Sequence, residues 1–109
     1  MKAIQIHSAG GPEALELVDL PIPQPEAGQV LIRIEATGVN FIEIYFRKGV
    51  YKASFPMIPG SEAAGTVEEL GPGVNGFKAG DAVVSMSVIA ATQSMLSFPP
   101  PNWSRSPKV

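Results

Sequence analysis

Hydrophobic and polar residues alternate in several short stretches of this chain, and a period of two is typical of half-buried β-strands. In the stretch KAIQIH near the N-terminus, Ile4 and Ile6 fall on one face. In QVLIRIEA, the apolar residues Val30, Ile32 and Ile34 share a face, and the charged residues point the other way. Later strand-like pieces are separated by glycines. The pattern therefore predicts several short strands joined by tight turns.

One stretch, GVNFIEIYFRKG, has the signals of a helix. Asn40 is a favoured N-cap, Glu43 stands three residues later as in a capping box, and Gly49 can end the helix. The predicted helix is barely two turns long. Short strands with Gly and Pro corners and one brief helix indicate a mainly β fold, such as a small barrel or sandwich.

The size and composition of the chain are those of one globular domain. It has 109 residues, of which 45% are hydrophobic and 17% charged, enough for one core and too few for two ordinary ones. The 8 Lys and Arg residues against 10 Asp and Glu residues give no basic surface for phosphates. Nucleic acid is therefore not expected as a partner.

The sequence contains no cysteine and one histidine, His7, which we expect to be solvated. Disulfides are excluded, and almost every zinc site would lack its ligands. No window approaches the about 18 apolar residues needed to span a bilayer, and the N-terminus lacks the apolar run of a secretory signal. We therefore expect no membrane partner and a cytoplasmic location.

Four phrases, in order, carry a resemblance to a known family: GGPEAL, QVLIRIEATGVNFIEIYFRKGVY, FPMIPGSEAAGTVEELGPGV and FKAGDAVV. Together they resemble the N-terminal catalytic domain of zeta-crystallin-like NADPH:quinone oxidoreductases, in the medium-chain dehydrogenase/reductase superfamily. The resemblance implies a partly open β-barrel like that of the co-chaperonin GroES, followed in the family by a Rossmann domain that binds NADPH. It covers residues 1–89, which we expect to form an incomplete catalytic domain, and residues 90–109 are expected to form an irregular tail.

The resemblance also implies zinc-free chemistry. Zinc-dependent relatives carry a Cys where this chain has Asn40 and a His where it has Ser61, which agrees with the absence of cysteine. An alcohol loses a proton as it loses hydride, so a Lewis acid on its oxygen helps. A quinone already accepts electrons and mainly needs to lie against the nicotinamide in a dry cleft.

The same resemblance assigns the site residues. The segment that would approach NADPH consists of Asn40, Phe41, Ile42, Glu43, Ile44 and Tyr45. Within it, Asn40 and Tyr45 would line the quinone cleft as catalytic residues. Both have an alternative role, Asn40 as a helix cap and Tyr45 as an amphipathic surface ring. For Glu43, the preferred role is that of the capping partner of Asn40.

Two further residues near this segment are less clearly placed. Tyr51 could join the site. Glu62 resembles the carboxylate that follows the missing zinc ligand, and a structural role is preferred for it over acid–base chemistry. The glycines at positions 60, 65, 71, 73 and 80 are expected to supply positive φ or close packing.

The C-terminal segment differs in composition from the rest of the chain. All ten acidic residues lie at or before Asp81, whereas residues 90–109 hold four prolines and no acid. Residues 90–109 can be encoded by codons that, when read in a frame displaced by one base, give an alternating strand like the one that family members carry at this point. We therefore interpret the segment as the result of a frameshift. The alternative is that FPPPNW is a polyproline ligand. Because the tail alternates poorly, we expect it to leave an unpaired sheet edge, open to self-association.

The glycine-rich strand–turn–helix that grips a pyrophosphate is not found in the sequence. We therefore expect a fragment of a zinc-independent NADPH-dependent quinone oxidoreductase, which reduces a quinone when intact and binds NADPH weakly or not at all alone. A homo-oligomer is possible. Two alternatives stay open: a non-catalytic barrel acting as an interaction or co-chaperonin-like module, and a fragment of a zinc-free enoyl reductase of the same superfamily.

Overall fold

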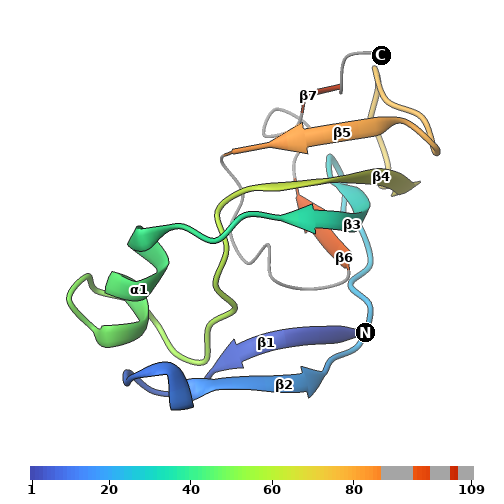
Figure 1. Ribbon diagram of the computed structural model, residues 1–109. Helices are drawn as coiled ribbons and strands as arrows, with labels where there is room; N and C mark the ends of the chain where they lie inside the picture. The colour runs from blue at the N-terminus through green and yellow to red at the C-terminus, as the bar shows by residue number, and fades with distance from the viewer. Residues whose placement is uncertain (87–94, 99–103, 106–109) are drawn as a thin grey trace.

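The computed structural model describes residues 1–86, 95–98 and 104–105 (Figure 1). The one α-helix within these ranges, α1, is Phe41–Lys48, and a short 3-10 turn, η1, is Pro12–Ala14. The strands are β1 (Lys2–Ile6), β2 (Leu15–Asp19), β3 (Val30–Thr37), β4 (Ala63–Leu70), β5 (Ala82–Ser85), β6 (Met95–Phe98) and β7 (Ser104–Arg105). The predicted mainly β fold with one short helix is confirmed, and the described residues contain no Rossmann domain.

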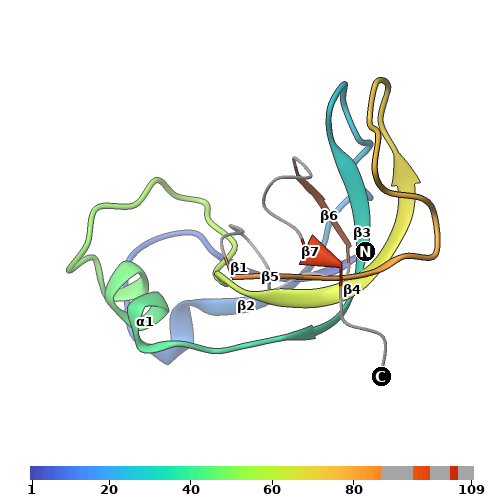
Figure 2. The same ribbon diagram turned by 90° about the horizontal axis from the view of Figure 1, so that it is seen from above.

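Five of the strands form one antiparallel sheet in the order β6-β3-β4-β5-β7. Its centre is the β3–β4 pair, whose register shifts between Leu31 and Ile32 and again between Ile34 and Ala36. Such irregularities increase local twist and bend the strands. Figure 2 shows the result: β3 and β4 curve strongly along their length, so the sheet is cupped like part of a barrel wall.

The core lies against one face of this sheet. Its buried residues are Val30, Ile32, Ala63, Val67 and Val83, contributed by β3, β4 and β5. The sequence predicts that Val30 and Ile32 of β3 face the core, and both are fully buried. Leu31, on the opposite face by alternation, is also only 4% exposed, so β3 begins with both faces covered.

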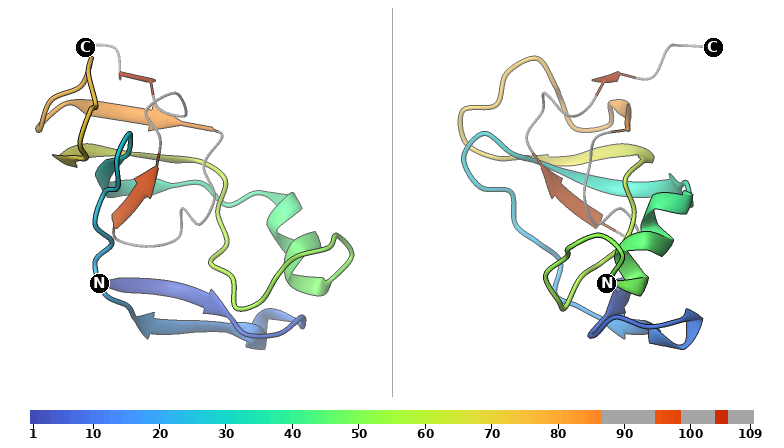
Figure 3. Two further views of the ribbon diagram at one scale, coloured as in Figure 1. Left: turned by 180° about the vertical axis from the view of Figure 1, so that it is seen from behind. Right: turned by 90° about the vertical axis from the view of Figure 1, so that its left-hand side faces the viewer.

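The other two strands, β1 and β2, form a separate hairpin below the sheet (Figure 3). The sequence pattern did not predict β2. A bridge joins the hairpin to the loop before β4: the Ile6 N–H donates to the Met57 carbonyl at 2.8 Å, and the Met57 N–H returns a bond at 2.9 Å. The Gly10 N–H donates to the Arg47 carbonyl at 2.9 Å, which fixes the hairpin to the end of α1.

The helix has the bounds that the sequence predicts. Asn40 is the N-cap in an extended conformation, and Gly49 ends α1 in the left-handed region with φ 80°. The chain leaves β3, forms α1 at one end of the molecule beside the hairpin, and returns through residues 50–62 to β4 (Figure 1). This route places the start of α1 next to the entry into β4.

The expectation that the tail leaves the preceding strands without an edge partner is wrong, and the edges of the open sheet are β6 and β7 themselves. β6 pairs with β3 through residues Met95–Phe98, and β7 pairs with β5 through Ser104–Arg105. Edge pairing uses backbone N–H and C=O groups, which do not require an alternating side-chain pattern. The predicted boundary between residues 89 and 90 and the prolines of FPPPNW lie outside the described residues.

Candidate functional site

The predicted segment Asn40–Tyr45 splits into two groups on the surface of α1. Phe41, Ile42 and Tyr45 are exposed, at 79%, 43% and 42% of their surfaces. Glu43 and Ile44 are half-buried. At about 100° per residue, positions four apart share a face, so Phe41 and Tyr45 lie together on the outer side of the helix.

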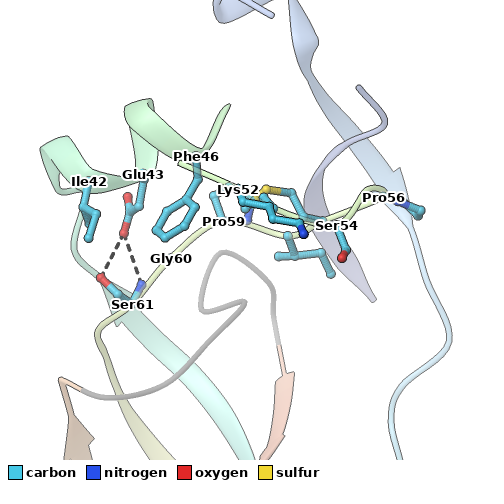
Figure 4. Close-up of a pocket in the computed structure, with 12 residues that line it drawn as sticks. Ile42, Glu43, Phe46, Lys52, Ser54, Pro56, Pro59, Gly60 and Ser61 are labelled. Atoms are coloured by element: carbon cyan, nitrogen blue, oxygen red, sulfur yellow. Dashed lines mark hydrogen bonds between the residues drawn. The ribbon is translucent and has the colours of Figure 1, made fainter. Parts of the chain in front are cut away.

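The Glu43 carboxylate accepts three hydrogen bonds and connects the start of α1 to the loop before β4. Its Oε2 accepts the Asn40 N–H at 3.1 Å, which is the carboxylate half of the predicted capping box. Its Oε1 accepts the Ser61 N–H at 3.1 Å and the Ser61 hydroxyl at 3.2 Å (Figure 4). The preferred role of Glu43 as the capping partner is confirmed, and the sequence did not predict its bonds to Ser61.

These bonds bring together the two positions, Asn40 and Ser61, at which the resemblance implies that zinc ligands are missing. Asn40 and Ser61 lie 21 positions apart in the sequence and both bind the Glu43 carboxylate. The groups present here are an amide, a hydroxyl and a carboxylate that already accepts three hydrogen bonds. Among the residues that the structure describes, no group of three or more His, Cys, Asp or Glu is placed to hold a metal ion.

Tyr45 belongs to an aromatic cluster that extends beyond the predicted segment. The ring of Tyr51 meets Tyr45 edge to face with centroids 5.4 Å apart, and meets Phe46 in the same way at 5.7 Å. The Tyr45 carbonyl accepts the N–H groups of Val50 and Tyr51, at 2.9 and 3.3 Å. The fold-back after Gly49 therefore brings Tyr51, exposed at 48%, next to Tyr45.

Glu62 has a structural position at the start of β4. Its carbonyl accepts the Thr37 hydroxyl at 3.0 Å and the Gly38 N–H at 3.4 Å. Its side chain lies across Gly38, where any Cβ would collide with the Glu62 carboxylate. These contacts agree with the structural role preferred for Glu62.

A cavity of about 550 Å³ opens on the inner side of α1, between the helix and the loop that leads to β4 (Figure 4). The sequence did not predict it, because its two walls are separate segments that tertiary contacts bring together. It is lined by Ile42, Glu43, Phe46, Lys52, Ala53, Ser54, Pro56, Met57, Ile58, Pro59, Gly60 and Ser61. Its walls are mostly apolar.

The chain, whose described part has a curved sheet, a hairpin and a single helix, matches a known protein family. The model of the alcohol dehydrogenase GroES-like domain matches residues 26–97, and the chain belongs to this family. The predicted resemblance to quinone oxidoreductases is confirmed by its relatives. A quinone oxidoreductase of Rattus norvegicus is 45% identical over 93 residues, which are 83% of this chain and 28% of the relative.

Solved structures agree with this assignment. The Escherichia coli quinone oxidoreductase complexed with NADPH has a TM-score of 0.94 and 35% identity, and the match covers 98% of this chain and 33% of that one. A mycobacterial protein complexed with NADPH has a TM-score of 0.91 and 44% identity, covering 98% and 34%. The chain thus spans about a third or less of the relatives it matches. No helix within the described ranges could cross a bilayer.

Proposed function

We propose that this chain provides the substrate-side lobe of a zinc-independent oxidoreductase that transfers reducing equivalents from NADPH to a quinone. The observation that carries the proposal is the outer face of α1. Phe41 and Tyr45 present exposed rings there, directly after an N-cap that Glu43 holds in place. A large apolar surface on a small domain is typical of a site that another body covers.

The residues on this face have properties that fit a nicotinamide cofactor. Asn40, Phe41, Ile42 and Tyr45 would hold its nicotinamide end, with Glu43 and Ile44 supporting them from the inner side of the segment. When bound, NADPH supplies the hydride. The apolar side chains exclude water, and the Asn40 amide and the Tyr45 hydroxyl can donate hydrogen bonds to a carbonyl oxygen.

Zinc independence is part of the proposal. The sequence has no cysteine, and the Asn40 and Ser61 positions are tied to a carboxylate that already accepts three hydrogen bonds. A quinone accepts electrons without a Lewis acid on its oxygen, so orientation by the α1 face is the contribution required of this lobe. The pyrophosphate grip would come from a second lobe, as the resemblance implies.

A chimaeric enzyme tests the proposal. The chain would replace the matched N-terminal part of the Escherichia coli quinone oxidoreductase, and NADPH-dependent quinone reduction would be followed by loss of NADPH absorbance. We expect turnover that a metal chelator does not change. Tyr45→Phe should lower kcat by about 100-fold if the hydroxyl donates to the acceptor oxygen, whereas the exposed control Lys78→Gln should have no effect.

Two results would contradict the proposal. One is a folded chimaera that binds NADPH and reduces no quinone. The other is a chimaera whose activity is lost with chelator and restored by zinc.

A further inference from the structure

The cavity on the inner side of α1 has the composition of a ligand site, and most of its lining, residues 52–61 with Phe46, has no part in the proposed function. We propose that it binds a small planar aromatic molecule bearing an anionic group, such as an aryl carboxylate, and that Lys52 recognises the anion. Neither Asn40 nor Tyr45 lines this cavity. Ile42 and Glu43 belong both to the cavity wall and to the proposed cofactor segment, but the recognition of the anion depends on Lys52, which the proposed function does not involve.

The size and walls of the cavity favour a small apolar ligand. Its volume of about 550 Å³ lies within the range of about 300–1,000 Å³ usual for small-molecule pockets. Ile42 and Phe46 are four residues apart and form one wall from α1, and Met57 and Ile58 contribute to the facing wall from the loop. The Phe46 ring offers a flat surface on which a planar ligand can pack.

The polar groups lie at the ends of the cavity. Lys52 and Ser54 are at one end, and Glu43 with Ser61 is at the other (Figure 4). The Glu43 carboxylate already accepts three hydrogen bonds, so it is engaged with the protein. Its negative charge would also turn an anionic ligand group toward the opposite end.

Lys52 is the group that makes the site selective. Its side chain is exposed, and across the part of the chain that the structure describes it makes no hydrogen bond or ion pair. An ammonium beside an apolar pocket attracts a carboxylate or sulfonate whose ring fills the pocket. The nearby Ser54 hydroxyl can donate a second hydrogen bond to the same group.

Two probes of the same shape test the inference on the full chain: 2-naphthoate, which is anionic, and 2-naphthalenemethanol, which is neutral. Binding would be followed by amide chemical shifts in a two-dimensional NMR titration. We expect both probes to shift signals of residues 52–61 and of Ile42 and Phe46. The anion should bind about 3- to 10-fold more tightly at low salt, and this preference should shrink as salt is added.

Substitutions separate the roles of charge and shape. Lys52→Gln should remove the preference for 2-naphthoate, whereas Lys48→Gln, an exposed lysine on α1 outside the cavity, should retain it. Phe46→Ala should weaken both probes. The inference is overturned if neither probe binds at millimolar concentration, if the shifted signals lie elsewhere, or if Lys52→Gln leaves the preference intact.

Discussion

A single carboxylate, that of Glu43, connects local helix structure to the arrangement of the site. It accepts the Asn40 N–H at the start of α1, and it holds both the N–H and the hydroxyl of Ser61. Hydrogen bonds to a charged acceptor are about twice as strong as neutral ones. Glu43 therefore stabilises the helix end and the loop that forms the facing wall of the cavity.

Replacing Glu43 with Gln should lower the free energy of unfolding by about 1–2 kcal/mol, because charge-assisted capping and loop bonds become weaker. Thermal or urea unfolding of the purified chain would measure the change. Glu69→Gln, at an exposed position of β4, is the matched control and should change stability by less than about 0.5 kcal/mol. Equal effects of the two substitutions would contradict the role assigned to Glu43.

The central elements of the fold are β3 and β4, and their close approach depends on Gly65. A Cβ at this position would collide with the Arg33 carbonyl oxygen and lie 3.0 Å from Ile32 Cγ2. The Arg33 carbonyl belongs to the backbone, so it cannot move away from an added Cβ as the end of a flexible side chain can. The absence of a side chain at Gly65 therefore permits the pairing at the point where the β3 register changes.

Gly65→Ala should reduce the free energy of unfolding by about 2–3 kcal/mol, because the added methyl group forces the two strands apart. A control is Gly73→Ala, where φ is +79° and no atom lies within 4 Å of the added Cβ. That change should cost only about 1 kcal/mol of backbone strain. Urea midpoints would rank the two variants, and the reverse order would contradict this reasoning.

An ion pair on the outer face links the same two strands. Arg33 donates to the two carboxylate oxygens of Glu68, from Nη2 at 2.8 Å and from Nε at 3.2 Å. These hydrogen bonds hold the pKa of Glu68 below its ordinary value. The unfolded chain lacks them, so it takes up the proton at a higher pH than the folded chain does.

This difference makes the contribution of Glu68 depend on pH. It is complete above the carboxyl's unfolded pKa and disappears as the pH falls through the lowered folded value. Glu68→Gln should therefore lower Tm at about pH 7 and have a smaller effect near about pH 3. Melting curves at both values would measure this, and an unchanged effect at low pH would exclude the ion pair as the cause.

At the scale of the whole molecule, we expect the sheet edges to influence whether the chain associates with other copies. β6 and β7 occupy the two edges beside β3 and β5. Unpaired edges present free N–H and C=O groups to other chains. The segments near the C-terminus thus have a structural role despite their unusual composition.

A chain ending at residue 86 should have a lower Tm and elute earlier in size-exclusion chromatography than the full chain, because β3 and β5 lose their edge partners. A chain ending at Arg105 retains both edge strands and serves as the control. If the shorter chain matches the full one in both measurements, the edge strands do not protect the sheet.

The sequence also predicts that the isolated chain has a low affinity for NADPH. It lacks the glycine-rich strand–turn–helix that binds a pyrophosphate, so a fluorescence titration should show no saturation up to about 1 mM NADPH. The chimaera with a cofactor lobe is the positive control. Micromolar affinity of the chain alone would show that one lobe suffices and would remove the need for a second lobe.

Sequence reasoning succeeded where the signal is local. The bounds of α1 follow from Asn40, Glu43 and Gly49, whose capping interactions involve residues within a few positions of one another. It missed β2, since that strand exists only through pairing with β1, and its residue Leu17 remains 69% exposed. A pattern search for a buried apolar face has little to detect in such a strand.

By itself, therefore, the sequence determined the types of the main elements, the ends of the helix, the absence of cysteine ligands and the resemblance to quinone oxidoreductases. Only the tertiary structure decided that the C-terminal strands pair with β3 and β5, that Ser61 meets Glu43, and that α1 and residues 52–61 enclose a cavity. The physical reason is the separation in sequence between the residues that interact. Capping and turn geometry depend on neighbours in the chain, whereas edge pairing and cavities depend on which distant segments come together.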